Sequence, residues 1–242
     1  MEFIQGFVNS KGVNIHYIDN DIKKSEATTL LICPGLSESC EDYIDFMSEF
    51  KDRRCVALSF RGRGKSDSPK DGYSLEDHVD DIVSVVSELC LDEFCIMGVS
   101  RGVSYALSYA ISNANVLKGL IVGEYPAVHK KMHSGWAKES MDFYDKYCDS
   151  ISITYDVLKC IEEESKQVDF AEALGKVTCP SLILKGELEE TLVSAEDIVS
   201  YVDNLGSKSI RVERFSKAGH DIISGDFEGL IKVTNEFFKS ID

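Results

Sequence analysis

The sequence predicts an α/β protein built on one central sheet whose strands run mostly parallel. Short apolar runs alternate along the chain with longer segments whose apolar residues recur at helical spacing. Because parallel neighbours need a crossover connection, usually a helix, this alternation favours a sheet covered by helices on both faces. The 242 residues, 43% of them hydrophobic, suffice for one such domain with a small insertion.

The first half of the chain contains the predicted hairpin and most of the strands. Residues 3–8 and 13–18 flank Asn9-Ser10-Lys11-Gly12, a turn signal, and therefore predict a β-hairpin. Ser74 is expected to cap a helix over 75–91, whose apolar residues fall on one face. Further strands are expected at 28–33, 55–58, 93–97 and 117–122, and further helices at 43–50 and 103–110.

The alternation stops after Gly123 and resumes at Ser181. Between about 124 and 177 the sequence predicts several helices and no strand. We therefore expect an α/β core formed by residues 1–123 and 178–242, with residues 124–177 as a helical cap insertion. The second part of the core is expected to hold strands at 181–185 and 209–215 and helices at 195–202 and 227–239.

Net charge, apolar stretches and cysteine spacing limit the partners and the location expected for the protein. The formal net charge of −16 argues against nucleic acid and anionic membrane surfaces as partners. The N-terminal residues lack a basic segment followed by an apolar one, and no stretch is long and apolar enough to span a membrane. The eight cysteines include no C-x-x-C pair. We expect a cytoplasmic protein with reduced thiols, no metal and no cofactor.

The strongest motif is Gly98-Val99-Ser100-Arg101-Gly102, which lies between a predicted strand and a predicted helix. G-x-S-x-G in this context is a nucleophile elbow, a sharp turn that exposes the serine hydroxyl. The serine is expected to adopt a strained backbone conformation, and side chains at either glycine would collide with neighbouring elements. The N–H of Arg101 is then left at the helix N-terminus, facing the same space as the Ser100 hydroxyl.

Because this elbow lies within alternating predicted strands and helices, the chain resembles the α/β-hydrolase superfamily over essentially its whole length. Three further segments fall where that superfamily has its motifs, in the same order along the chain. They are Cys33-Pro34-Gly35-Leu36, Leu184-Lys185-Gly186-Glu187-Leu188-Glu189 and Ala218-Gly219-His220-Asp221. The resemblance implies Ser100 as nucleophile, His220 as base and Glu189 as orienting acid. It also implies that the N–H groups of Leu36 and Arg101 form an oxyanion hole.

The acid has other candidates. Glu124 ends the predicted strand 117–122, where some members of the superfamily carry the acid, and Glu187 and Glu190 flank Glu189. Glu189 is preferred because it lies three residues after Gly186, on the loop where the superfamily most often places its carboxylate.

Arg101 and the histidines at 129 and 133 have two interpretations each. Arg101 either recognises a substrate carboxylate or forms an ion pair with a core carboxylate such as Glu124, and the ion pair is favoured. His129 and His133 would present a metal-binding pair if they lay on a helix, but no third ligand is evident, so surface histidines are favoured. His16 is expected to be an ordinary strand histidine.

The resemblance implies a serine hydrolase that cleaves a small carboxylic ester, lactone or thioester through an acyl-enzyme. A serine at the elbow, where epoxide hydrolases and haloalkane dehalogenases need a carboxylate, argues against those two chemistries. Two alternatives within the superfamily stay open. One is a carbon–carbon bond hydrolase or a menaquinone-pathway-like synthase acting on a carboxylate-bearing substrate, and the other is a slow-turnover small-molecule receptor. A small molecule is the expected partner, and the oligomeric state is left open.

Overall fold

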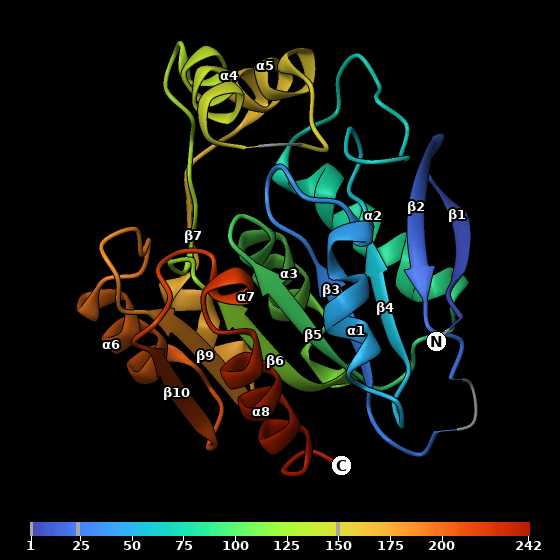
Figure 1. Ribbon diagram of the computed structural model, residues 1–242, viewed down its shortest axis with the longest axis vertical. Coiled ribbons are helices and arrows are strands. Elements are labelled where there is room, and N and C mark those ends of the chain that lie inside the picture. The colour runs from blue at the N-terminus through green and yellow to red at the C-terminus, as the bar shows by residue number, and fades with distance from the viewer. Residues whose placement is uncertain (1, 23–24, 149–150) are drawn as a thin grey trace.

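An eight-stranded sheet forms the core of the computed structural model, which describes residues 2–22, 25–148 and 151–242 (Figure 1). The strand order is β1-β2-β4-β3-β5-β6-β9-β10. Neighbours from β4 to β10 pair in parallel, whereas β2 runs antiparallel to both β1 and β4. The strands are β1 Ile4–Ser10, β2 Val13–Asp19, β3 Thr29–Cys33, β4 Cys55–Leu58, β5 Phe94–Val99, β6 Leu117–Gly123, β9 Ser181–Gly186 and β10 Ile210–Phe215. The predicted fold class and strands are confirmed.

The α-helices predicted for the core are present, with a different end for α2, whereas the short helices η1, η2 and α7 were not predicted. Helix α2 ends at Glu88, three residues before the expected end, and Cys90 just beyond it has a positive φ of 51° that does not continue a helix. Helix α7 was not predicted; its N-cap Asp221 accepts a hydrogen bond from the Ser224 N–H. The core helices are η1 Cys40–Tyr43, α1 Ile44–Ser48, α2 Leu75–Glu88, α3 Gly102–Ser112, η2 Ala114–Val116, α6 Ala195–Asn204, α7 Ile222–Gly225 and α8 Phe227–Phe238.

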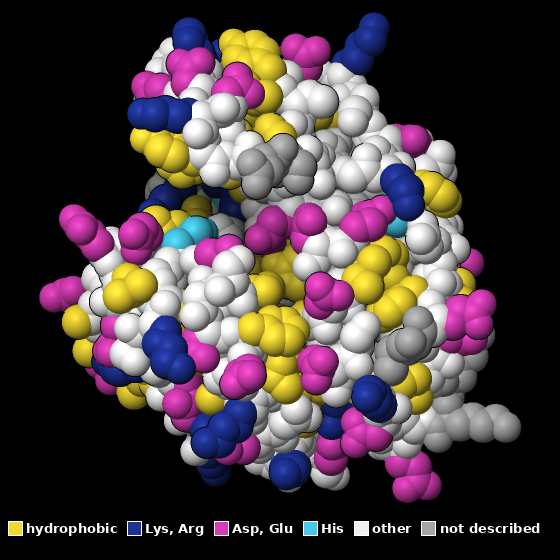
Figure 2. All heavy atoms as spheres, viewed as in Figure 1, with side chains coloured by type: hydrophobic (Ala, Val, Ile, Leu, Met, Phe, Trp, Pro, Cys, Tyr) yellow, Lys and Arg dark blue, Asp and Glu magenta, His cyan; other side chains and the backbone are white. Residues whose placement is uncertain are grey.

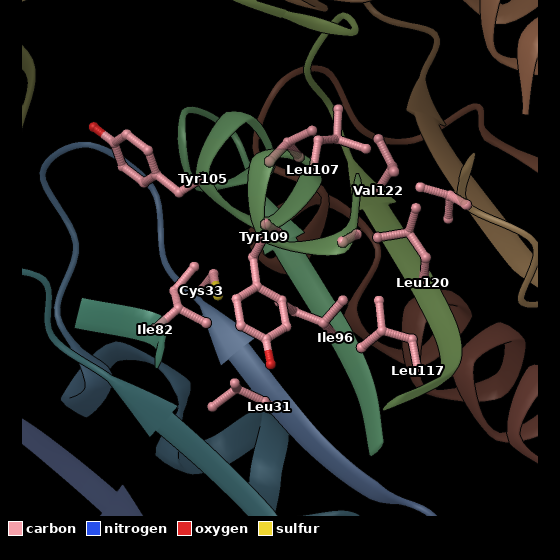
Figure 3. Close-up of a cluster of buried hydrophobic side chains, with 14 of the residues drawn as sticks. Leu31, Cys33, Ile82, Ile96, Tyr105, Leu107, Tyr109, Leu117, Leu120 and Val122 are labelled. Carbon is pink, nitrogen blue, oxygen red and sulfur yellow. The ribbon is translucent and has the colours of Figure 1, made fainter. Parts of the chain in front are cut away.

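The sheet separates two hydrophobic layers because successive side chains of a strand point to opposite faces. Leu31 and Cys33 of β3 face the layer covered by α2, α3 and α6, part of which is drawn in Figure 3. Leu30 and Ile32 face the layer covered by α1 and α8. Both layers are buried almost completely, which holds the strand ends of the sheet in fixed positions.

A helical insertion stands above the core between β6 and β9 (Figure 1). We call α4 (Trp136–Tyr147) and α5 (Tyr155–Glu164) the cap; they pack together around their own small apolar cluster. The expectation of no strand in this segment was wrong, because β7 (Val128–His129) and β8 (Val168–Asp169) pair antiparallel. Two-residue strands are too short for a periodic signal. The last helix of the insertion, η3 (Ala171–Lys176), packs on α3 and α6 of the core.

No helix in the described part of the chain is long and apolar enough to cross a bilayer.

The turn between β5 and α3 has the strained geometry predicted for it. Ser100 has a φ of 50°, in the left-handed region that side chains rarely adopt. A Cβ on Gly98 would lie 2.6 Å from the Cα of Val103, and one on Gly102 would lie 2.2 Å from the carbonyl oxygen of Cys33. The two glycines therefore let α3 approach both β5 and the end of β3.

We expect Gly102→Ala to destabilise the fold by about 1–3 kcal/mol or more, because the new methyl group meets backbone that cannot move independently of the sheet. Urea unfolding measures the change. Gly175→Ala is the matched control, since a Cβ there meets only the carbonyl oxygen of Asn204, at 3.8 Å. Equal stability of the two variants would contradict the steric account of the elbow.

Candidate active site

A cavity of about 890 Å³ lies between the cap and the ends of the core strands, and Figure 2 shows the hollow between these two parts of the molecule. Its lining comes from the loop 35–38, the elbow, α4 and the segment 220–224. This is the volume of a typical small-molecule site. Ser100, which the sequence singled out, lies on its wall.

Ser100 and His220 meet in this cavity, although 120 residues separate them in the sequence. The Nε2 atom of His220 lies 2.9 Å from the hydroxyl oxygen of Ser100. The elbow at the end of β5 presents the serine, and the loop between β10 and α7 presents the histidine. A neutral imidazole at this distance can accept the proton of the hydroxyl, which is the arrangement needed to activate a serine nucleophile.

The carboxylate beside His220 is that of Glu124. Its Oε2 lies 3.6 Å from the Nδ1 of His220. This separation exceeds hydrogen-bond length, and Nδ1, which is buried, has no hydrogen-bond partner among the described residues. Such contacts are often long in unliganded enzymes and shorten once substrate is bound. Glu124 also has a left-handed backbone, with a φ of 53°, so strain marks both Ser100 and Glu124.

Hydrogen bonds keep Glu124 ionised although its side chain is buried. Burial alone would raise the pKa of this carboxyl, but the neighbouring His220 ring, one donor at the end of β9 and two donors from the loop after β9 outweigh it and lower the pKa. The donors are the Gly186 N–H at 2.7 Å, the Thr191 hydroxyl at 2.7 Å and the Leu192 N–H at 2.9 Å. The negative charge faces His220 and can stabilise an imidazolium there.

Glu189, the preferred acid in the sequence analysis, does not lie beside His220, and the preference is corrected to Glu124. Glu187, Glu189 and Glu190 are all exposed. The turn approaches the histidine loop with its backbone, because the N–H groups of Glu187 and Leu188 donate to the carbonyl oxygen of Ala218. This loop therefore holds the Glu124 carboxylate through Thr191 and Leu192, and its own glutamates point to solvent.

The N–H groups of Leu36 and Arg101 have no acceptor among the described residues. Leu36 follows Gly35, where a Cβ would lie only 3.2 Å from the Cβ of Ser100, so this loop lies close to Ser100. The Gly35 N–H and the Tyr43 hydroxyl both donate to Glu38 Oε2, each at 2.6 Å. Sequence analysis missed Glu38, whose carboxylate anchors the loop. Free N–H donors near Ser100 are what an oxyanion hole requires, and that role stays a prediction.

Arg101 is buried at the cavity wall, and the ion pair expected for it is absent. No carboxylate in the described part of the chain lies within 4 Å of its guanidinium, and Glu124 interacts with other groups. The acceptors around Arg101 are neutral: the Tyr105 hydroxyl at 3.1 Å, His129 Nε2 at 3.2 Å and the Lys130 carbonyl oxygen at 3.4 Å.

The two histidines proposed as a surface pair have different environments. His129 lies in β7 and is buried, with its Nδ1 2.9 Å from the Ser104 hydroxyl, so the expectation of a surface histidine was wrong. His133 is exposed and contacts Glu139 at 2.9 Å. The segment between them is not helical, and the two rings do not form an i, i+4 pair on one face.

One group of metal-ligating side chains occurs among the described residues, away from the cavity. His16, Cys40 and Glu41 each offer a donor atom, all within 4.8 Å of one another. His16 is packed in its strand, as expected, with its Nδ1 3.2 Å from Cys40 Sγ. Burial raises the pKa of the Cys40 thiol and favours the protonated form, and Lys65 lies 3.1 Å from Glu41. None of the three residues lines the cavity.

Comparison with known proteins identifies the fold. The family model of the alpha/beta hydrolase fold matches residues 28–147. The chain has the α/β-hydrolase fold. No curated protein sequence matches it.

Solved structures of α/β-hydrolases are similar over nearly the whole chain. MGS-M2, an alpha/beta hydrolase enzyme from a Medee basin deep-sea metagenome library, has a TM-score of 0.81 and 16% identity, with 97% of each chain covered. The carboxylesterase CesB (YbfK) from Bacillus subtilis has a TM-score of 0.77 and 17% identity, covering 98% of this chain and 92% of that one. An N-formylmaleamic acid deformylase from Pseudomonas putida S16 has a TM-score of 0.74 and 19% identity, covering 97% and 100%. At these identities the likeness establishes the fold.

The position of Glu124 predicts how the reactivity of Ser100 depends on the two candidate acids. Glu124→Gln should slow labelling of Ser100 by a fluorophosphonate about 10²- to 10⁴-fold, because the charge that stabilises the imidazolium is lost. Glu189→Gln, the matched control on the exposed loop, should label at the wild-type rate. Circular dichroism and the melting temperature establish that both variants are folded. A slow Glu189→Gln beside a fast Glu124→Gln would restore the assignment made from sequence.

The buried His129 predicts a loss of stability in acid. Burial, and next the charge of Arg101, lower the pKa of His129 from 6.5 to about 3. Between these two values the unfolded chain binds a proton that the folded protein does not, so stability falls as the pH falls through this window. The contribution is at most about 1.4 kcal/mol per pH unit.

Urea unfolding between pH 7.5 and 4.5 should therefore show a shallower pH dependence for His129→Gln than for the wild type. His133→Gln, which changes an exposed histidine, should keep the wild-type slope. Some slope should remain in both variants, because burial also lowers the pKa of His78. Identical slopes for wild type and His129→Gln would contradict a neutral, buried His129.

Proposed function

We propose that the protein is a serine hydrolase that cleaves a small carboxylic ester through an acyl-enzyme intermediate. The observation that carries the proposal is the contact of 2.9 Å between His220 Nε2 and the Ser100 hydroxyl, in a cavity of small-molecule size. The names of similar structures, a carboxylesterase and a deformylase among them, agree with hydrolysis of an acyl group. Lactones and thioesters would form the same kind of intermediate.

In the proposed reaction Ser100 attacks the carbonyl carbon of the ester while His220 accepts the hydroxyl proton. The developing negative charge on the carbonyl oxygen is stabilised by the N–H groups of Leu36 and Arg101, which have no competing acceptor among the described residues. His220 then donates the proton to the departing alcohol. Glu124 holds the imidazole in orientation and stabilises its charged form.

The second half of the proposed cycle uses the same groups. A water molecule enters in place of the alcohol, His220 accepts its proton, and the resulting hydroxide attacks the acyl-enzyme carbonyl. Collapse of this second intermediate breaks the bond to Ser100 and returns the proton to the serine oxygen. The acid product leaves, and no cofactor takes part in the steps as written.

Labelling with a fluorophosphonate followed by mass spectrometry tests the proposal, because this probe reacts only with an activated serine. Ser100 should be the residue labelled, and Ser100→Ala should lower kcat on short-chain esters by at least about 10³-fold. Ser87→Ala, which removes an exposed hydroxyl outside the cavity, is the matched control and should keep wild-type activity.

Labelling at a different serine, or undiminished activity of Ser100→Ala, would refute the mechanism. Saturable ligand binding without turnover across a panel of acyl chain lengths would instead favour the slow-turnover receptor.

A further inference from the structure

We propose that Arg101 binds a carboxylate of the substrate, so that the preferred substrates are esters carrying a negative charge, such as half-esters of short dicarboxylic acids. The ester part of this statement rests on the proposed function, whereas the carboxylate site itself is argued from the surroundings of Arg101.

Arg101 has no carboxylate partner among the described residues, whereas most of the other arginines have one. Every other arginine except Arg63 has a carboxylate oxygen between 2.5 and 3.8 Å from its guanidinium. Those pairs are Arg53–Asp242, Arg54–Asp19, Arg61–Asp81, Arg211–Glu213 and Arg214–Glu187. Of the two arginines without such a partner in the described residues, only Arg101 lines the cavity.

The groups that surround Arg101 solvate its charge without neutralising it. Its NH1 atom lies 3.4 Å from the Lys130 carbonyl oxygen and 3.9 Å from the Met132 sulfur, both of which are uncharged. The ring of His129, buried beside it, stays neutral near pH 7 and supplies no counter-charge. A buried cation without an anion is costly, and an anion brought by the substrate would compensate it.

The acidic side chains in the cavity wall already have donors of their own. Glu124 accepts from the end of β9 and the loop after it, Glu38 from Gly35 and Tyr43, and Asp221 from Ser224. The other two behave likewise, with Asp42 accepting from Ser39 and Glu139 contacting His133. These groups therefore do not pair with Arg101. Of the two cations in the cavity wall without a carboxylate partner in the described residues, Lys130 is exposed and lies over the Tyr125 ring, whereas Arg101 is buried.

Arg101 and Ser100 line the same cavity. A carboxylate held by the guanidinium and an ester attacked by Ser100 can therefore belong to one small molecule. A bidentate contact between guanidinium and carboxylate would also fix the orientation of the ester.

Binding to the inactive Ser100→Ala protein tests the site separately from hydrolysis. The probes are monomethyl glutarate, which carries a carboxylate, and methyl glutaramate, its neutral amide counterpart. Titration calorimetry should show the charged probe binding roughly 10- to 150-fold more tightly than the neutral one, the range expected for hydrogen bonds to a charged group. In Ser100→Ala/Arg101→Met this preference should disappear.

Arg214→Met in the Ser100→Ala background is the matched control, because Arg214 lies outside the cavity and should leave the preference intact. Equal binding of both probes to Ser100→Ala, or a preference that survives Arg101→Met, would overturn the proposal. Melting temperatures establish that each variant is folded. If Arg101→Met does not fold, Arg101→Lys, which keeps the charge but loses the bidentate contact, should reduce the preference.

Turnover of the same probes by the wild type separates the two proposals. Charge-selective binding without hydrolysis would refute the esterase function and keep the carboxylate site. Hydrolysis of both probes at the same kcat/KM would keep the esterase function and refute the site.

Discussion

The site depends on the contacts made by the buried carboxylate of Glu124. It joins three segments that are distant in the sequence: the end of β6, the loop after β9 and the loop that carries His220. Two backbone N–H groups and one hydroxyl fix its oxygens, so the charge cannot turn away from the imidazole. The strained backbone at Glu124 is maintained because the surrounding parallel strands are packed on both faces.

Much of the fold could be predicted because local signals and long-range packing agree. The apolar runs of β3 to β6 are buried on both sides, and their lengths and spacing are visible in the sequence. The elbow could also be predicted, since the glycines at 98 and 102 are required by contacts with neighbouring backbone. The meeting of Ser100 and His220 could be predicted from the two motifs that contain them, Gly98–Gly102 and Ala218–Asp221.

The remainder depends on information that a sequence pattern does not carry. The choice between Glu124 and Glu189 turns on whether the loop after β9 presents side chains or backbone to the histidine, and both loops contain glutamates. The missing ion pair of Arg101 could not be predicted either, because the carboxylate thought to pair with it is held by other donors. Strands β7 and β8 are too short for their pairing to leave a periodic signal.

The two-stranded ribbon formed by β7 and β8 connects the cap helices α4 and α5 to the core. His129 belongs to β7 and contacts both Arg101 and Ser104. This contact joins the base of the insertion to the N-terminal end of α3. A displacement of β7 would therefore be transmitted to the guanidinium of Arg101 through His129 and the neighbouring Lys130 carbonyl group. Exchange of the cap for another insertion would change the polarity around that guanidinium even if every residue of the sheet were kept.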